Sequence, residues 1–402
     1  MKWWFFFTLI FSSFVASAEI DICIPAFPEM QDFFNLTPFQ TEGLLSINIL
    51  VNCIALIFVG ALSNKYGKKK VIELGFYVFL LGTIGCIFAN SYRTILIARA
   101  IQGAGVAAPM SLMMLFVFDK CKPEKQQQSV NFLAGASTLG VSIAPLLGSY
   151  MTIYMGWRGS FFALIILGVL AMCLNYFNLD NDKTEKLDKA DSPKGFFSGY
   201  SDVLGGKSSM IAILATTISI GLYYSFVGMA PLILINSMGV KIEDFGFYQG
   251  ILVLSFGVFS ILSGFFVNQK NIKFFYSGSI FLVIAFLFIM TSALLFKPFS
   301  HPMYFTGTIV ILSIGAVVTI NTLYVFAINS MPSLKSITSS MINIGKSVFA
   351  AIGMQLSSYF YTDDFKSTAL VMVVMEVLAL MLTLYLFITD LSFRKAVGFL
   401  KS

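Results

Sequence analysis

Charged residues and histidine are scarce in this chain. Of its 402 residues, 11% are charged and 57% are hydrophobic, and the mean hydropathy is +0.84. Such a composition excludes an ordinary soluble domain and indicates a protein that lies in a lipid bilayer. The single histidine, His301, falls between two apolar runs, and we expect it to be a solvated loop residue.

Patterns typical of metal sites, disulfide frameworks and nucleotide hydrolysis are also missing. The five cysteines have neither CxxC spacing nor a histidine nearby, so they suggest no zinc site and no disulfide framework. No GxxxxGK[ST] loop is present, which argues against an ATP-driven pump. A polytopic membrane enzyme is disfavoured as well, because the chain lacks clustered His, Asp and Glu. We expect no metal and no cofactor.

What the chain does contain is a series of apolar runs, each close to the ~20 residues that cross a bilayer as a helix. Twelve such runs are found. They span 3–26, 41–63, 71–90, 94–118, 127–151, 157–178, 208–236, 245–268, 273–296, 302–330, 335–360 and 367–390. We therefore predict an all-α polytopic membrane protein with twelve transmembrane helices.

Lysine and arginine lie mostly on one side of these runs. With the N-terminus taken as inside, 19 of the 26 fall on the inside and five on the outside, while Arg99 and Lys346 lie within runs. The positive-inside rule then places both termini in the cytoplasm. The net charge of +6 reflects this orientation, and no basic stretch carries the interleaved aromatics of a nucleic-acid reader.

The opening run has two interpretations. Its lysine, its apolar core and the small residues around Ala16–Ala18 also fit a secretory signal peptide. Cleavage would leave five runs before the long polar segment and six after it, whereas retention gives six and six. We favour a retained helix, which a mature chain that starts at Glu19 would contradict.

One long polar segment, 179–207, divides the runs into two sets. It balances lysines against acids and contains Ser-Pro and Gly-Gly pairs, which is typical of a flexible tether. We predict two pseudo-symmetric six-helix bundles, 1–178 and 208–402, joined by a cytoplasmic linker at 179–207. Many transporters built in this way rock about a central site.

The loop after the second run reads Gly60-Ala-Leu-Ser-Asn64-Lys65-Tyr-Gly67 and continues with three lysines. A glycine allows helices to approach closely, a tight turn follows, and the cations gather at the cytoplasmic rim. We expect Gly60, Asn64, Lys65 and Gly67 to act in gating and helix packing. A lysine-rich topology loop would explain the cations but not the glycine spacing.

The fourth run contains Arg99-Ala-Ile-Gln102-Gly103. A cation within a span usually faces the bundle interior and a partner, although Arg99 is close enough to the outer loop to snorkel. Gly103 is a candidate for close helix packing. The structural alternative is an arginine that merely holds a carboxylate for packing.

The fifth run carries a small residue at every fourth position. Ala136, Gly140, Ala144 and Gly148 form a stripe at which another helix can approach closely. Pro145 removes a backbone donor and permits a bend. A bendable close contact is what rocking between two halves requires.

These stretches resemble the major facilitator superfamily, and in particular its twelve-helix drug:proton antiporters of the Bcr/CflA type. Further matching stretches are Trp157-Arg158, Tyr224-Ser225, Pro231, Gly239 and Phe245-Gly246. The resemblance covers nearly the whole chain. It implies a proton-coupled multidrug exporter in the bacterial inner membrane, monomeric, whose partners are a small-molecule substrate, protons and lipid. It also implies a role for Arg99 in proton coupling. The family has aspartate where this chain has Asn64.

Acids within spans are candidates for carrying the proton, because a buried charge is costly unless it is paired or neutralised. Asp21 precedes Pro25 and Pro28, a pattern that the family carries at the end of its first span. At ~100° per residue, Glu19 and Asp21 lie on different faces of a straight helix. We expect Asp21 to titrate, with Glu19 as the second choice and Arg99 nearby. The alternative is that Asp21 merely ends the helix near water.

Lys346 is unusual because it lies deep in the eleventh run, ~18 Å from its start at 1.5 Å per residue. It could pair with Glu376 as a structural bridge, or it could face the cavity and bind an acidic substrate group. We count it among the expected cavity residues. These are Tyr223, Tyr224, Phe226, Met229, Asn343 and Lys346.

The leading function is proton-coupled export of small amphipathic compounds by alternating access. The alternative within the same class is a transporter of one metabolite, such as an amino acid or an organic acid. Lys346 favours the alternative slightly, whereas the motif in the fifth run disfavours it.

Overall fold

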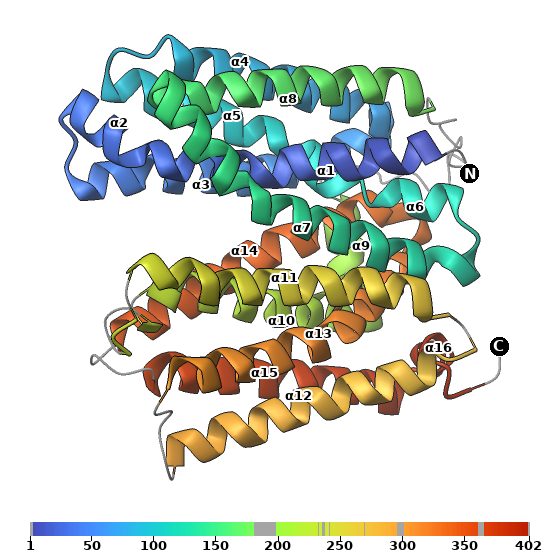
Figure 1. The fold of residues 1–402 in the computed structure, drawn as a ribbon. Coiled ribbons are helices and arrows are strands. Elements are labelled where there is room, and N and C mark those ends of the chain that lie inside the picture. Colours follow the sequence, from blue (N-terminus) through green and yellow to red (C-terminus); the bar gives the residue numbers. More distant parts are fainter. Residues whose placement is uncertain are drawn as a thin grey trace. The chain divides into compact units, whose positions relative to one another are not determined.

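The computed structural model describes residues 3–180, 198–231, 233–234, 238–240, 242–268, 270–295, 301–360 and 366–400 (Figure 1). All regular structure within these ranges is helical, and no strand occurs in them. A helix satisfies its backbone hydrogen bonds internally, which a bilayer requires because it offers no water to bond. The all-α fold class predicted from the apolar runs is confirmed.

Each of the twelve predicted runs coincides with one long helix. These helices are α1 (Trp3–Cys23), α3 (Pro38–Tyr66), α4 (Lys68–Ile87), α5 (Tyr92–Leu112), α7 (Pro123–Met155), α8 (Trp157–Asn178), α10 (Lys207–Pro231), α11 (Ile242–Phe266), α12 (Ile272–Leu295), α13 (Pro302–Ser330), α14 (Lys335–Tyr359) and α15 (Lys366–Thr389). The short helices are α2 (Phe27–Phe34), α6 (Leu115–Lys120), α9 (Ser198–Gly205) and α16 (Leu391–Ala396), with 3-10 turns η1 (Ile24–Ala26) and η3 (Pro332–Leu334).

Not every long helix is equally apolar. Among the described residues, nine spans are long and apolar enough to cross a membrane, and ten if the bent pair α9–α10 counts as one. The other two helices are α11, whose apolar part Gly250–Phe266 is shorter, and α14, whose first half is rich in Ser and Thr. These numbers are consistent with the predicted twelve helices.

Local sequence signals account for several helix ends. Thr37 and Ser91 each form a capping box, with Gln40 and Thr94 respectively, at the starts of α3 and α5. His301, which the sequence suggested was a plain loop residue, caps α13, because its Nδ1 accepts a hydrogen bond of 3.1 Å from the Met303 amide. Each cap satisfies an amide that the first turn of a helix leaves without a partner.

The helices cluster into two compact units. Unit 1 comprises residues 1–120, 136–200 and 333–340, and unit 2 comprises 121–135, 201–332 and 341–402. Two long helices, α7 and α14, contribute residues to both. The predicted linker 179–207 lies largely outside the described residues, since 181–197 are not described, and its last part forms α9.

The two units share a pattern of helix neighbours. In unit 1, α5 packs against α1, α3 and α4, and α8 packs against α1 and α4. In unit 2, α13 packs against α10, α11 and α12, and α15 packs against α10 and α12. These five contacts correspond when α1, α3, α4, α5 and α8 are paired with α10, α11, α12, α13 and α15, whereas the contact between α3 and α4 has no such counterpart between the described parts of α11 and α12. This correspondence is what an internal duplication would produce.

Close helix packing in unit 1 depends on glycine. A Cβ added at Gly105 of α5 would lie 2.2 Å from the amide nitrogen of Phe79, and one at Gly82 of α4 would lie 2.4 Å from that of Gln102. The absence of a side chain at these positions lets α4 and α5 lie in contact along their length (Figure 1). This contact fixes the position of Arg99, which lies on α5.

Candidate functional site

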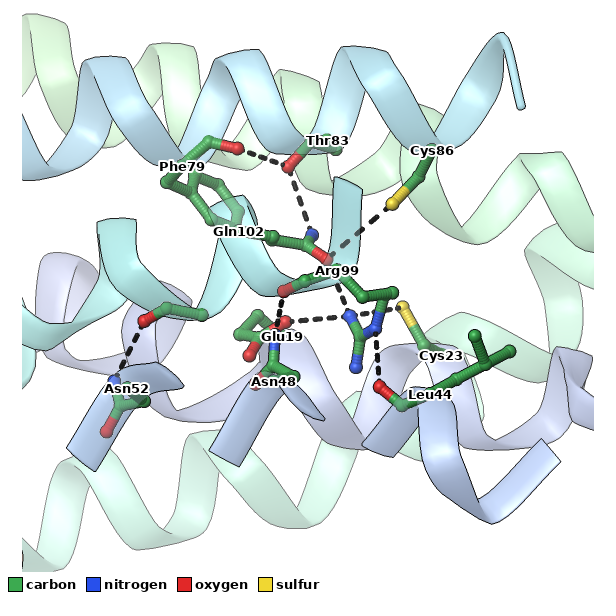
Figure 2. A network of polar contacts seen from close by, with 11 residues as sticks. Glu19, Cys23, Leu44, Asn48, Asn52, Phe79, Thr83, Cys86, Arg99 and Gln102 are labelled. Carbon is green, nitrogen blue, oxygen red and sulfur yellow. Dashed lines mark hydrogen bonds and ion pairs between the residues drawn. The ribbon is translucent and has the colours of Figure 1, made fainter. Parts of the chain in front are cut away.

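A buried ion pair connects α1 and α5 inside unit 1. Arg99 Nη1 donates a hydrogen bond of 3.1 Å to Glu19 Oε2, and both residues have 0% of their surface exposed (Figure 2). The same nitrogen lies 3.9 Å from Cys23 Sγ, and Nε lies 3.4 Å from the Leu44 carbonyl oxygen. Residues of three helices, α1, α3 and α5, therefore surround the guanidinium group.

Gln102 extends the network toward α4. Its Oε1 accepts a bond of 2.6 Å from Arg99 Nη1, and its Nε2 donates to Thr83 Oγ1 at 3.0 Å. Thr83 in turn donates to the Phe79 carbonyl oxygen at 2.8 Å. Since Gln102 lies three residues after Arg99, the two side chains share one face of α5. Figure 2 shows the chain of polar groups from Glu19 through Arg99 and Gln102 to Thr83.

Two asparagines of α3 attach that helix to the backbone of α5. Asn48 Nδ2 donates to the Arg99 carbonyl oxygen and Asn52 Nδ2 to that of Gly103, each at 3.1 Å. The predicted packing residue Gly103 makes this possible, because a Cβ there would lie 2.3 Å from the Asn48 carbonyl oxygen. The backbone of α5 is thus bonded to α3 at two successive turns, at Arg99 and at Gly103.

Several atoms of the network have no hydrogen-bond partner within the described ranges. They are Glu19 Oε1, Arg99 Nη2 and Asn48 Oδ1, and all three are buried. An isolated buried charge costs several kcal/mol, and pairing offsets that cost only where the remaining polar atoms are also bonded. Stability alone is therefore a poor explanation for this ion pair, and a role in function accounts for it better.

The structure pairs Arg99 with Glu19, which the sequence analysis ranked second to Asp21. Asp21 lies two residues further along α1 and is half-buried, and no ion pair involving it occurs among the described residues. As expected, Glu19 and Asp21 lie on different faces of α1. Thr8, Ser12 and Glu19 are all fully buried, whereas the side of α1 that carries Asp21 is partly exposed. The fully buried acid is thus the one paired with Arg99, whereas Asp21 is partly exposed.

The predicted gating loop forms the tight connection between α3 and α4. Gly67 has a φ of +89°, a conformation that favours glycine. A Cβ at Gly60 would lie 2.9 Å from Ile337 Cα, so a side chain there would clash with the part of α14 that belongs to unit 1. Lys65 is exposed, whereas Asn64 Nδ2 is buried without a partner in the described part of the chain.

The lysines that follow this loop have specific partners that the sequence did not reveal. Lys68 forms a salt bridge of 2.9 Å with Asp119, whose other carboxylate oxygen lies 3.9 Å from Lys335. Lys69 is 9% exposed, and its Nζ donates to the carbonyl oxygens of Tyr176 at 2.9 Å and Leu179 at 2.7 Å. Lys69 thus binds the C-terminal end of α8, where carbonyl groups lack partners within the helix.

The small-residue stripe of α7 meets α1. A Cβ at Gly148 would lie 2.1 Å from the Ile22 carbonyl oxygen, and one at Gly140 would lie 2.7 Å from Phe14 Cδ2. Ala144, between them, is fully buried, whereas Pro145 is exposed and lies inside the continuous helix. The stripe therefore packs against the helix that carries Glu19 and Asp21.

Two of the predicted cavity residues lie in a packed apolar core. Phe226 and Met229 are 0% and 3% exposed and belong to the apolar core of unit 2. Tyr223 lies with its ring 5.6 Å from that of Phe256, and Asn343 is 8% exposed. The side chain of Tyr224 lies outside the described residues.

Lys346 is half-buried on α14. Its suggested partner Glu376 has an Oε2 atom without a hydrogen-bond partner among the described residues, and the structural bridge between the two stays a prediction. A cavity of about 480 Å³ lies between α11, α12 and α13, with Phe259, Phe274 and Phe281 among its lining, and it includes none of the predicted cavity residues.

No group of three or more His, Cys, Asp and Glu residues able to hold a metal occurs in the described ranges. The polar residues that sequence reasoning missed are Asn48, Asn52 and Thr83, and Gln102 had been noted without a role. The sequence did contain a signal for the two asparagines. Asn48 and Asn52 lie four residues apart within an apolar run, which places both polar side chains on one face of the helix. What the sequence could not supply is which helix lies opposite.

Comparison with known proteins bears on the family and the fold of the chain. The sequence model of the Major Facilitator Superfamily matches residues 9–354. The multidrug resistance protein MdtL of Shigella flexneri serotype 5b (strain 8401) is 23% identical over 241 residues, which is 60% of this chain and 60% of MdtL. The chain thus matches less than two thirds of the length of this curated relative.

Solved structures match over a greater length. The crystal structure of the transporter FucP in the outward conformation has a TM-score of 0.73 at 14% identity and covers 94% of this chain and 98% of FucP. The human organic anion transporter MFSD10 (TETRAN) has a TM-score of 0.75 at 13% identity and covers 95% and 99%. At such low identities these similarities demonstrate the fold alone.

Proposed function

The chain belongs to the major facilitator superfamily, whose sequence model matches residues 9–354, and we propose that it exports small amphipathic compounds in exchange for protons. The observation that carries this proposal is the fully buried Glu19–Arg99 pair, with the half-buried acid Asp21 one half-turn away on α1. Within the superfamily, the motifs that resemble the Bcr/CflA branch and the similarity to MdtL support drug efflux.

The two acids of α1 have different roles in this proposal. Protonation of Glu19 would leave the guanidinium group of Arg99 buried without a counter-charge, which is strongly unfavourable. Asp21 can gain or lose a proton without breaking an ion pair. We therefore assign the exchanged proton to Asp21, with Glu19 and Arg99 as a fixed charge pair that positions α1 against α5.

Alternating access would connect the proton to the cargo. Secondary transporters of this type move one bundle against the other around a fixed site. The contact of Gly140 and Gly148 with α1 provides a close, smooth surface beside Asp21, and Pro145 allows α7 to bend. Because this contact lies within unit 1, movement of unit 1 as one body would carry Asp21 with it and expose Asp21 to one side of the membrane at a time.

The proposal places the protein in the bacterial inner membrane with both termini in the cytoplasm, as the distribution of positive charge favours. The proposal keeps the first helix in the mature protein, and the burial of its residues Leu9, Ser12 and Val15 within unit 1 supports this. The expected partners are a small molecule, protons and lipid, and the expected state is a monomer.

Two experiments test this function. Deletion of the gene should sensitise cells to several unrelated drugs, whereas loss of a metabolite importer should not. In inverted membrane vesicles, a proton gradient should drive uptake of ethidium and of some members of a small drug panel. Absence of uptake for every compound, with the protein present in the membrane, would contradict the proposal.

A second candidate is the transport of one anionic metabolite. It is favoured by Lys346, a half-buried cation near the middle of α14. Under this alternative Lys346→Gln should abolish transport of an organic anion in the vesicle assay. If Lys346→Gln spares anionic substrates, the alternative fails.

A further inference from the structure

Unit 2 contains a buried acid that the proposed mechanism does not use. Glu376 is the only acid in α15 and lies near its middle. It is 3% exposed, and its Oε2 atom has no hydrogen-bond partner among the residues that the structure describes. An ionisable group of this kind within a membrane helix marks a functional site unless a structural partner accounts for it.

The surroundings of Glu376 are apolar. Ala369, Met372, Ala379 and Leu386 recur at helical spacing on its side of α15, and all are at most 2% exposed. The first three belong to the apolar core of unit 2, which includes Phe226 and Leu222 of α10. The buried face of α15 around Glu376 is therefore mainly apolar, with a polar residue, Thr383, two turns further along.

The cations of the helices that pack against α15 lie at its end rather than at Glu376. Lys207 of α10 lies 5.4 Å from the ring of Tyr385, which is nine residues, or ~14 Å along the helix, from Glu376. Lys273 of α12 lies 4.7 Å from the ring of Phe399, beyond the end of α15.

The remaining titratable groups of these elements are Tyr223, Tyr224 and Tyr276 together with Arg394 and Lys395 of α16, and α14 adds Lys346. Tyr276 contacts Phe393, also beyond the end of α15. None of these groups is a hydrogen-bond partner of Glu376 Oε2 in the described ranges.

An ionised carboxylate in such a place would cost several kcal/mol, whereas the neutral acid costs far less. Burial of this kind therefore favours the neutral form of the carboxyl group. Glutamine and methionine have similar size and would avoid the cost of ionisation altogether. What distinguishes glutamate is that it can release a proton when water reaches it.

We propose that Glu376 is a second proton-binding site, located in unit 2. It is loaded in the conformation described here. When the unit opens to water, the carboxyl O–H bond breaks, the proton passes to water and the carboxylate remains. This inference rests on the proposed proton-coupled export and adds to it a second exchanged proton, independent of Asp21.

Infrared spectroscopy tests the loaded state without any substrate. At neutral pH, wild-type protein in lipid vesicles should show a carbonyl band of a protonated carboxylic acid that is lost in Glu376→Gln. Glu124→Gln, which makes the same change at an exposed position, should keep the band. Glu376→Met provides a second variant with a side chain suited to the apolar core. If the band persists in both Glu376 variants, Glu376 is ionised or is not the source, and the inference is overturned.

Proton release tests the exchange. Ethidium added to detergent-solubilised protein in weak buffer should release protons, and Glu376→Gln should release roughly half as many per ethidium bound, as linkage requires for one of two sites. Equal release from both proteins would make Glu376 a fixed neutral acid and overturn this inference alone. No release from wild-type protein would contradict the proposed export itself as well.

Discussion

Arg99 binds Glu19 through a single terminal nitrogen, Nη1, which also donates to Gln102, while Nη2 has no partner in the described part of the chain. A guanidinium group placed purely for packing would be expected to use more of its five donors. The Nη2 atom of Arg99 is therefore available to bond another acceptor when the neighbouring helices move. In the proposed function this pair stays ionised, and the exchanged proton is assigned to Asp21.

Removal of one member of this pair should destabilise the protein. Glu19→Gln leaves Arg99 buried without a counter-charge, and such a change costs about 3–5 kcal/mol. We expect a marked fall in the melting temperature of the purified protein in detergent. The double variant Glu19→Gln/Arg99→Met should recover part of the loss, because it removes both charges. A Glu19→Gln protein that melts like the wild type would contradict the assignment of a buried ion pair.

The contact between α7 and α1 should tolerate no added methyl group. Gly148→Ala would place a Cβ 2.1 Å from the Ile22 carbonyl oxygen, and overpacking of this kind costs roughly 1–3 kcal/mol. Gly307→Ala is the matched control, because a Cβ there has nothing within 4 Å. Thermal melting should separate the two variants clearly. Equal melting temperatures would mean that α7 and α1 are not in close contact.

Lys69 should stabilise the end of α8, whereas its neighbour Lys70 should not. Lys69→Met leaves the carbonyl oxygens of Tyr176 and Leu179 without their donor, at a cost of about 1–3 kcal/mol. Lys70 is exposed, and Lys70→Met should have little effect. Limited proteolysis after Leu179 is a sensitive measurement, since release of the end of α8 should speed cleavage. If both variants are cleaved at the same rate, the contact of Lys69 with the end of α8 does not stabilise that end.

Most of the fold was accessible from the sequence because the bilayer imposes a simple rule. Each apolar run of sufficient length must form a helix, and a long helix lies at each of the twelve predicted positions. At Gly67 the backbone has a positive φ, and at Gly148 α7 closely approaches α1 within unit 1. Periodicity carries such local information without knowledge of neighbours.

The partners within the site were harder to predict. Glu19 and Asp21 could be placed on different faces of α1, but the sequence gives no rotation of that helix relative to α5. The structure buries the face of Glu19 and joins it to Arg99. In the same way, Lys68 and Lys69 appeared as a general basic cluster, whereas their bonds to Asp119 and to the end of α8 depend on which helices are neighbours.

The predicted cavity illustrates a further limit. Phe226 and Met229 were chosen as aromatic and flexible side chains suited to a drug, yet both lie in the core of unit 2. Composition does not distinguish a side chain that packs between helices from one that faces a cavity. Only helix rotation separates the two, and apolar helices such as α10 carry almost no amphipathic signal to define it.

The measurement that tests the central claim most directly is ethidium accumulation in liposomes with a pH difference as the only driving force. Wild-type protein and Asp32→Asn, a matched change at an exposed acid of α2, should accumulate ethidium. Asp21→Asn should insert and melt normally but show no accumulation, because it removes the proton carrier and leaves the Glu19–Arg99 pair intact. Undiminished pH-driven accumulation by Asp21→Asn would contradict the account.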